Sequence, residues 1–174
     1  MTNHTMRAVQ LSETGGPEVL RLVDVPLPDP GPGQVRVRAA AIGAGGPDVL
    51  IRNGTYKWMP PLPAIPGNEM AGMVDAVGAG VTRLSEGDRV LVSARELAQR
   101  GGCYAECICV SESAPFVLPP GLGFEDAVSW ATSSSLLRCL RAMATCGRRP
   151  SSCRVRRAAS RPRWRRLRAH AGCA

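Results

Sequence analysis

The sequence is poor in the side chain that most often binds catalytic metals. Only two of its 174 residues are histidines, His4 and His170, and they stand at the two extremities. A catalytic zinc site needs about three Cys, His or acidic ligands around one open metal position, so this scarcity argues against zinc chemistry. No apolar run reaches the roughly 18 residues of a membrane span, and the first residues lack the apolar stretch of a secretion signal. We therefore expect a cytoplasmic protein with no membrane partner.

Acidic side chains are absent from the last quarter of the chain. Residues 1–132 hold all 14 Asp and Glu against 10 Lys and Arg, whereas residues 133–174 hold 12 Arg and neither Lys nor an acid. The overall charge of +8 thus averages two unlike parts, one near −4 and one near +12. We interpret them as a domain over residues 1–132 and an Arg-rich tail over residues 133–174. A segment with so much charge of one sign cannot bury it in a core, which predicts that the tail is disordered.

Short alternating apolar stretches punctuated by Gly and Pro dominate residues 1–132. They predict about seven strands, at 6–11, 19–25, 34–42, 70–77, 88–92, 104–110 and 116–118. A short helix over about 47–53 is expected because Pro47 and Asp48 suit a helix start and Gly54 a helix end. A second helix is expected to begin near Phe124, with acids in its first turn. Many strands and two short helices predict a mainly β domain in the form of a small, partly open barrel.

Five motifs follow one another in residues 45–124. They are Gly45-Gly-Pro-Asp-Val-Leu-Ile-Arg-Asn-Gly-Thr-Tyr56, Leu62-Pro-Ala-Ile-Pro-Gly-Asn-Glu-Met-Ala-Gly-Met-Val74, Val77-Gly78 with Gly87-Asp-Arg-Val90, Gly102-Cys-Tyr-Ala-Glu106 and Leu118-Pro-Pro-Gly-Leu-Gly-Phe124. In this order and spacing they resemble the N-terminal half of quinone oxidoreductases, the zeta-crystallin-like members of the medium-chain dehydrogenase/reductase superfamily. The resemblance spans residues 6–132.

The resemblance implies a GroES-like barrel that carries the substrate side of an active site, followed by an NADPH-binding Rossmann α/β domain. It implies hydride transfer from NADPH to a quinone or an activated enone, without zinc, and a possible homodimer in the intact relative. Positions that match the family's substrate-binding or cofactor-binding sites are Gly45, Asp48, Arg52, Tyr56 and Thr132. Because family barrels pack against the Rossmann domain, we expect its loss to expose an apolar face around Ala127–Ala131.

Several positions leave the role of the site open. Tyr56 is the family's Gly-x-Tyr tyrosine, which lines the substrate or nicotinamide pocket, although a Tyr packed on the barrel wall fits equally well. Asp48 and Arg52, four residues apart on one helical face, can form an ion pair beside the pocket or a solvated surface pair. Gly45 stands where the family commonly has Asn, and Leu50 where many members have Tyr, so the substrate is not defined.

The residues that bind zinc in related dehydrogenases are replaced in this sequence. Asn68-Glu69 stands where zinc-dependent relatives have His-Glu, and residues 43–45 lack their Cys. Cys103, Cys107 and Cys109 are expected on one face of the strand at 103–110, where they could bind a soft metal or act as small core side chains. The second interpretation is favoured. An odd total of seven cysteines also predicts free thiols rather than a disulfide framework.

The family pattern stops after Thr132, where a strand and the Gly-rich turn that binds the cofactor pyrophosphate should follow. A one-base shift of the reading frame in a GC-rich gene explains this. In the shifted frame, each new codon consists of the last base of one original codon and the first two bases of the next. Read in this way, the codons for Val155-Arg-Arg-Ala-Ala-Ser160 permit Gly-Ala-Ala-Gly-Gly-Val, the family's cofactor-binding turn. We therefore interpret residues 133–174 as a frameshifted remnant of the start of the Rossmann domain, with the shift near residues 132–137.

The alternative is a genuine tail. In that case residues 154–168, with Trp164 among their arginines, could bind nucleic acid through phosphate contacts and stacking. The chain would then be a non-enzymatic GroES-like binding module with a nucleic-acid-binding tail.

Overall fold

The computed structural model describes residues 4–131. In chain order the elements are β1 (Thr5–Leu11), the 3₁₀ helix η1 (Pro17–Val19), β2 (Leu20–Pro26), β3 (Gln34–Gly43), α1 (Gly46–Arg52), β4 (Glu69–Val77), β5 (Arg89–Ser93), the 3₁₀ helix η2 (Ala94–Glu96), β6 (Cys107–Ser111), β7 (Phe116–Val117) and α2 (Phe124–Ala131). The expected mainly β architecture with two short helices is confirmed.

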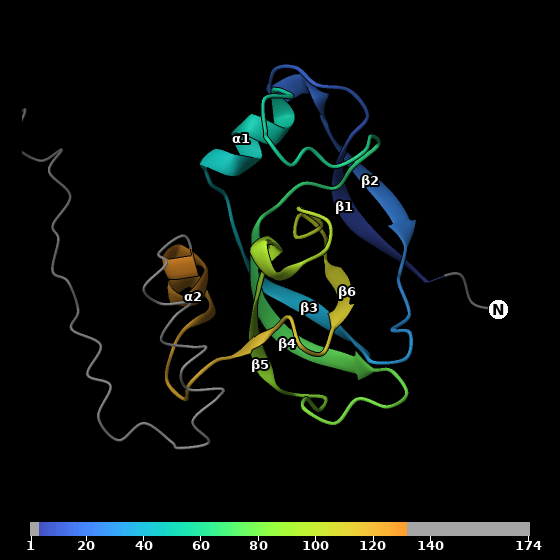
Figure 1. Ribbon diagram of the computed structural model, residues 1–174, viewed down its shortest axis with the longest axis vertical. Coiled ribbons are helices and arrows are strands. Elements are labelled where there is room, and N and C mark those ends of the chain that lie inside the picture. Colours follow the sequence, from blue (N-terminus) through green and yellow to red (C-terminus); the bar gives the residue numbers. More distant parts are fainter. Residues whose placement is uncertain (1–3, 132–174) are drawn as a thin grey trace, which may run out of the picture.

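The strands form two open antiparallel sheets. Five strands pair in the order β6-β3-β4-β5-β7, and β1 pairs with β2 in a separate ribbon. Figure 1 shows the ribbon beside the main sheet, with α1 near the upper end of the ribbon and α2 on the opposite side of the molecule. Non-sequential neighbours such as β6 and β3 bring residues about 70 positions apart into register, with Val35 opposite Val110.

The β3–β4 pair is the longest and the most strongly bent. Its register shifts twice, between Arg36 and Val37 and between Ala39 and Ala41. Such bulges bend a strand and increase its twist, which allows the sheet to curl. Gly72 lies opposite this bend, where a Cβ atom would overlap the carbonyl group of Arg38. The close approach of the two backbones therefore requires glycine at this position.

Three apolar clusters fill the domain. Alternate residues of β3, β4 and β5 point to the largest cluster, whose buried members include Val35, Val37, Met70, Val74, Val90 and Val92. A second cluster lies under α2 and contains Leu91, Phe116 and Ala127. A third joins the β1–β2 ribbon to β6 through Met6, Ala8 and Cys107. The main sheet is thus packed on both faces over part of its area.

Helix α2 is part of the barrel rather than an exposed appendage. Ala127 and Val128 are buried against the sheet, so the expected exposed apolar face is wrong at these two positions. Arg89 of β5 reinforces the contact, because its Nη2 donates a hydrogen bond of 2.5 Å to the Leu122 carbonyl oxygen. Its guanidinium also lies 4.4 Å from the centre of the Phe124 ring, a distance typical of a cation–π contact.

The predicted strand over 104–110 begins later than expected, at Cys107. Gly101 and Gly102 have positive φ angles and turn the chain towards the loop before β4. There the backbone amide of Gly102 donates to the Ile65 carbonyl oxygen, and that of Tyr104 donates to the Pro66 carbonyl oxygen. Ala105 then forms only an isolated bridge to Ala8. Hydrogen bonding to other segments thus replaces the first part of the expected strand.

The prediction that Cys103, Cys107 and Cys109 share one face is therefore wrong for Cys103, whereas Cys107 and Cys109 alternate onto the same face of β6. Cys103 is buried in the largest cluster, and Cys107 is buried beneath the β1–β2 ribbon. The thiol of Cys109 donates to the Pro28 carbonyl oxygen at 3.6 Å. The interpretation of Cys103 and Cys107 as core side chains is confirmed.

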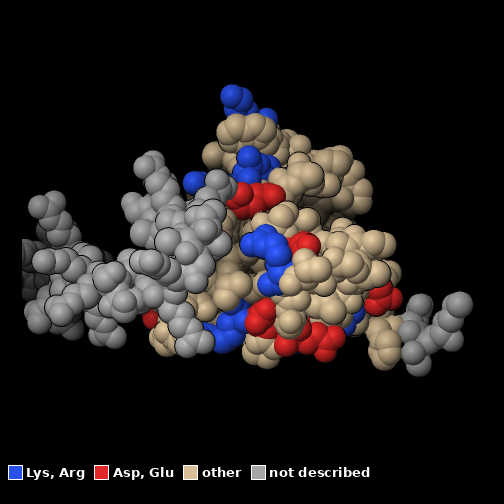
Figure 2. All heavy atoms as spheres, turned by 60° about the horizontal axis from the view of Figure 1, so that its bottom comes forward, with Lys and Arg blue, Asp and Glu red and all other residues tan. Residues whose placement is uncertain are grey.

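Acidic and basic side chains lie near one another on the face of the described residues shown in Figure 2. Asp75 is paired with two arginines, since its Oδ1 lies 2.8 Å from Arg36 Nε and its Oδ2 lies 2.8 Å from Arg38 Nη2. Arg7 pairs with Glu106 at 2.8 Å. None of the helices in residues 4–131 has the length and apolar character needed to cross a membrane.

Two leucines provide a matched test of this core. Leu91 is fully buried beneath α2, whereas Leu22 is 68% exposed on β2. We expect Leu91→Ala to lower the free energy of unfolding by about 2–5 kcal/mol, because it removes packed methyl groups and leaves a cavity. Leu22→Ala should change it by less than about 0.5 kcal/mol. Urea unfolding followed by circular dichroism measures both, and equal effects would contradict the placement of the core.

Candidate functional site

The site is built around the buried carboxylate of Asp48 in the first turn of α1. Asp48 is 7% exposed. Its Oδ2 accepts a hydrogen bond of 2.8 Å from the backbone amide of Gly45, and its Oδ1 accepts one of 2.7 Å from Nδ2 of Asn68. The first bond caps the start of the helix, and the second ties α1 to the residue that precedes β4. A charge taken out of water needs such donors, so Asp48 fixes the relative position of both segments.

Neither arrangement considered for Asp48 and Arg52 is present, because Asp48 is buried and no ion pair joins the two side chains. Arg52 instead donates from Nε and Nη2 to the Asn53 side-chain oxygen, at 3.2 and 2.9 Å, and no ion pair among residues 4–131 joins it to Asp48. The two residues have the right spacing, but the carboxylate turns inward to the Gly45 and Asn68 donors. Arg52 remains at the surface of the helix.

Tyr104 lines the same cavity as Asp48. Its backbone amide donates to the Pro66 carbonyl oxygen at 2.9 Å, and its own carbonyl oxygen accepts from the Val9 amide at 2.8 Å. Gly67 has φ near +101°, and a Cβ atom there would overlap the Tyr104 ring. The ring is thus held by backbone hydrogen bonds and by a glycine that leaves room for it.

A pocket of about 400 Å³ lies between these groups. Its apolar lining comes from Leu20, Ala44, Val49 and Pro66, and the other lining residues are Gly45, Gly46, Asp48, Arg52 and Tyr104. Three of the residues predicted from the sequence, Gly45, Asp48 and Arg52, therefore share one cavity. Its size lies in the range of small-molecule sites.

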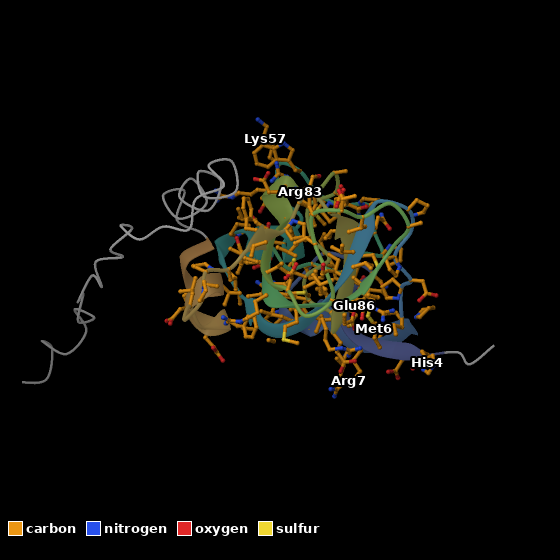
Figure 3. All side chains as sticks on the ribbon, turned by 90° about the horizontal axis from the view of Figure 1, so that it is seen from below. His4, Met6, Arg7, Lys57, Arg83 and Glu86 are labelled. Atoms are coloured by element: carbon orange, nitrogen blue, oxygen red, sulfur yellow. The ribbon has the colours of Figure 1, made fainter. Side chains whose placement is uncertain are left out.

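Tyr56 and Thr132 are not among the residues that line this pocket. Tyr56 is half-buried, with its ring edge-on to Trp58 at 5.7 Å between centroids. Figure 3 shows the neighbouring Lys57 projecting away from the body of the protein, and Lys57 Nζ lies 5.3 Å from the Trp58 ring centre. Thr132 lies outside the described residues. The roles of both stay predictions.

Burial and the charge of Asp48 set the electrostatics of the site. Burial raises the pKa of Glu69, and the Asp48 carboxylate raises it further, while Arg95 acts in the opposite direction. The pKa of Tyr104 is also raised, by burial first and then by the charge of Asp48 and a hydrogen bond with it. Burial likewise raises the pKa of the Cys103 thiol, with smaller contributions from Glu69 and Asp48. The neutral forms of all three groups are favoured.

Residues 4–131 do not provide a complete set of ligands for a metal ion or for a dinucleotide cofactor. No three His, Cys, Asp or Glu side chains of this part are grouped so that they could hold a metal ion. His4 lies at the start of the chain, beside Met6 and Arg7 and apart from the Lys57 segment (Figure 3). The Gly-rich turn Gly43-Ala-Gly-Gly46 leads into α1, but this helix has only seven residues and its start is occupied by the Asp48 carboxylate, whose charge would repel a dinucleotide pyrophosphate there. The described residues do not fit NADPH as a whole, and we derive no hydride step from them.

Sequence reasoning did not single out Tyr104 and Asn68 as site residues. Both belong to motifs that carried the resemblance, but their position beside Asp48 depends on contacts across 56 and 20 residues. One local signal pointed to Tyr104, the Gly101-Gly102 doublet immediately upstream. It marks a turn that aims the following segment at another part of the chain.

The mainly β fold with two short helices and open sheets fits a GroES-like domain. The family model described as "Alcohol dehydrogenase GroES-like domain" matches residues 31–121. The chain belongs to this family, as the resemblance implied.

The similar proteins include quinone oxidoreductases. The chain is 40% identical over 125 residues to the quinone oxidoreductase of Lama guanicoe. This matched segment covers 71% of this chain and 37% of the relative. The quinone oxidoreductase structure from Pseudomonas syringae matches with a TM-score of 0.68 and 36% identity, over 80% of this chain and 41% of that one. The structure of the Escherichia coli quinone oxidoreductase complexed with NADPH matches with a TM-score of 0.63 and 34% identity, over 70% of this chain and 36% of that one. The chain therefore spans less than half the length of these relatives.

The raised pKa of Glu69 predicts a pH-dependent effect on stability. An acid whose pKa is higher in the folded than in the unfolded chain binds its proton more tightly when the chain is folded. The contribution of this acid to the free energy of unfolding therefore falls as the pH rises above the acid's pKa in the unfolded chain. Glu69→Gln removes this loss. We expect the stability of the variant relative to the parent chain to increase between about pH 4 and pH 7.

Urea unfolding across this pH range measures the difference. Glu86→Gln, which removes an exposed carboxylate, supplies the baseline for losing one negative charge. If the two variants follow the same pH dependence, Glu69 is not the buried acid described above.

Proposed function

We propose that the chain encodes the substrate-side half of a zinc-independent reductase that transfers hydride from NADPH to a quinone or an activated enone. The observation that carries this proposal is the 125-residue match to quinone oxidoreductases. The family-model match over residues 31–121 includes all residues that line the pocket beside Asp48 except Leu20. NADPH is proposed because it is the ligand of the similar Escherichia coli structure. No metal is required when a nicotinamide supplies the hydride and the protein positions the two reactants.

The pocket suits the substrate side of such a reaction. Its apolar walls can hold a small ring, while Asp48 and Tyr104 provide a polar end that fixes orientation. Within this proposal Gly45, Asp48, Arg52, Tyr56 and Thr132 contact substrate or cofactor, with Tyr56 and Thr132 acting outside the described cavity. The intact enzyme is proposed to be a cytoplasmic homodimer.

The second part of the proposal concerns residues 133–174. Two observations support a frameshift near residues 132–137. The segment has 12 arginines and no acid, and the genetic code permits the cofactor-turn sequence in the shifted frame. The NADPH-binding domain is then encoded out of frame. In this view the 174-residue chain binds NADPH weakly or not at all and does not turn over substrate.

Sequencing the gene from codon 120 to several hundred bases beyond codon 174 tests the frame directly. We expect the shifted frame to stay open and to encode a Rossmann domain. Restoring one base should then yield a protein that binds NADPH with micromolar affinity, measured by nucleotide fluorescence, and that oxidises it in the presence of small ortho- and para-quinones or an enone. The 174-residue chain, prepared in parallel, should show neither signal. Micromolar NADPH binding by the unrepaired chain would contradict the proposal.

Early closure of the shifted frame would favour the second candidate, a binding module with a genuine Arg-rich tail. Its +12 charge predicts nucleic-acid affinity that falls steeply with salt, because each phosphate contact releases counterions. A filter-binding titration between about 50 and 200 mM salt measures that slope. A shallow response would exclude this candidate.

A further inference from the structure

Arg52 brings a positive charge and unused hydrogen-bond donors to the pocket beside Asp48. The residue is half-buried in the last turn of α1 and belongs to the pocket lining. Its Nε and Nη2 atoms donate to the Asn53 side-chain oxygen at 3.2 and 2.9 Å. A guanidinium has five N–H donors, so these two bonds leave three donors for a ligand.

No acidic side chain of residues 4–131 forms an ion pair with Arg52. Asp48 is on the same helix, but it is 7% exposed and accepts hydrogen bonds from the Gly45 amide and the Asn68 side chain. A half-buried guanidinium beside apolar walls is less well solvated than one in open water. Within the described part of the chain, the positive charge of Arg52 is therefore left without an anionic partner in hydrogen-bond contact.

The two charged residues of the lining are separated along the helix. Asp48 lies in the first turn of α1 and Arg52 in the last, and four residues of an α-helix rise by about 6 Å. An anionic oxygen that contacts Arg52 at about 2.8 Å can therefore lie farther from the Asp48 carboxylate than from the guanidinium. Coulomb energy falls with distance, so attraction to Arg52 then exceeds repulsion by Asp48.

The backbone around Arg52 is held in place. The Arg52 carbonyl oxygen accepts a hydrogen bond of 2.9 Å from the Gly15 amide, and the Asn53 amide donates to the Val49 carbonyl oxygen at 3.0 Å. The Asn53 side chain holds one edge of the guanidinium. A planar fork that is already oriented loses less freedom when it binds a ligand.

We propose that Arg52 makes this pocket selective for the anionic form of small phenol-like or enol-like ligands. The charged oxygen of the ligand contacts the guanidinium, and its ring or conjugated carbon chain lies against the apolar walls from Leu20, Val49 and Pro66. A hydrogen bond from a guanidinium to an anionic oxygen is stronger than one to a neutral hydroxyl group. Because Arg52 is only half-buried, solvent screening keeps the preference modest.

This inference rests on the proposed function for its ligand class and extends it. When a quinone or an enone accepts a hydride, a C–H bond forms and the π electrons move to the oxygen. That oxygen stays negative until it takes a proton from water. A guanidinium in contact with the oxygen stabilises the charge as it develops. Arg52 is then a catalytic residue that acts by electrostatic stabilisation.

A fluorinated phenol tests the proposal on the complete 174-residue chain without NADPH. The fluorines of 2,6-difluorophenol lower the pKa of its hydroxyl group to near neutral, and their ¹⁹F signal reports both binding and ionisation. Its methyl ether, 2,6-difluoroanisole, keeps the ring and cannot ionise. Between about pH 5.5 and pH 8.5, we expect the dissociation constant of the phenol to fall about three- to tenfold as the anion forms. That of the ether should stay constant, which controls for titration of the protein.

Two variants locate the effect. Arg52→Gln removes the charge of the lining, so the phenol should bind this variant with the same affinity at both pH values. Arg21→Gln removes an exposed arginine of β2 that is not a lining residue, and it should keep the preference of the parent chain. Both variants lose one positive charge and keep the Arg-rich segment after residue 132. Circular dichroism and a thermal melt confirm that each variant is folded.

Equal affinity for the phenol and its anion, or no saturable binding of the anion, would overturn the proposal, and both results come from the parent chain alone. A preference that survives in Arg52→Gln would also overturn it, because other cations of the chain would then be responsible. Neither the reading frame after residue 132 nor hydride transfer enters these measurements. A negative result here is therefore distinguishable from failure of the proposed reductase function, which the gene sequence and the NADPH assays decide.

Discussion

The buried carboxylate of Asp48 is the constraint on which the candidate site depends. An unpaired charge at 7% exposure would be costly, and the chain meets that cost with donors from Gly45 and Asn68 and with the Tyr104 hydroxyl group. Three segments that are distant in sequence are thereby drawn together, namely the start of α1, the approach to β4 and the turn after Gly101-Gly102. The pocket is the space that remains between them.

Much of the fold could be predicted from the residues, because its signals are local. Alternating apolar residues and Gly or Pro boundaries placed the strands within one or two residues, as for β3, and Pro47 and Gly54 bracketed α1. The errors arose where long-range contacts compete with local pattern. Cys103 to Glu106 alternates like a strand, yet its backbone pairs with the loop at 65–67 and with β1. Ala127 and Val128 were assigned to a missing partner, although the barrel's own sheet buries them.

The site was predictable only in part, for the same reason. The motif around α1 pointed to Gly45, Asp48 and Arg52, which share the pocket. The i to i+4 spacing of Asp48 and Arg52 suggested an ion pair, but spacing on a helix cannot reveal which side chain has better donors inside the protein. Asn68 and Tyr104 complete the polar cluster through tertiary contacts that no short window of sequence contains. Glu69 similarly shows nothing unusual in sequence, and its raised pKa arises from burial beside Asp48.

The contact between Arg89, Leu122 and Phe124 also defines where one module ends. Because α2 supplies Ala127 and Val128 to the cluster that covers β5 and β7, the chain completes its first hydrophobic core only after the helix has been made. The packing unit described by residues 4–131 therefore includes α2. If the chain is cut or joined to a relative beyond Ala131, both faces of the sheet stay covered. If the junction is made before Phe124, α2 is lost and one face of the sheet is exposed.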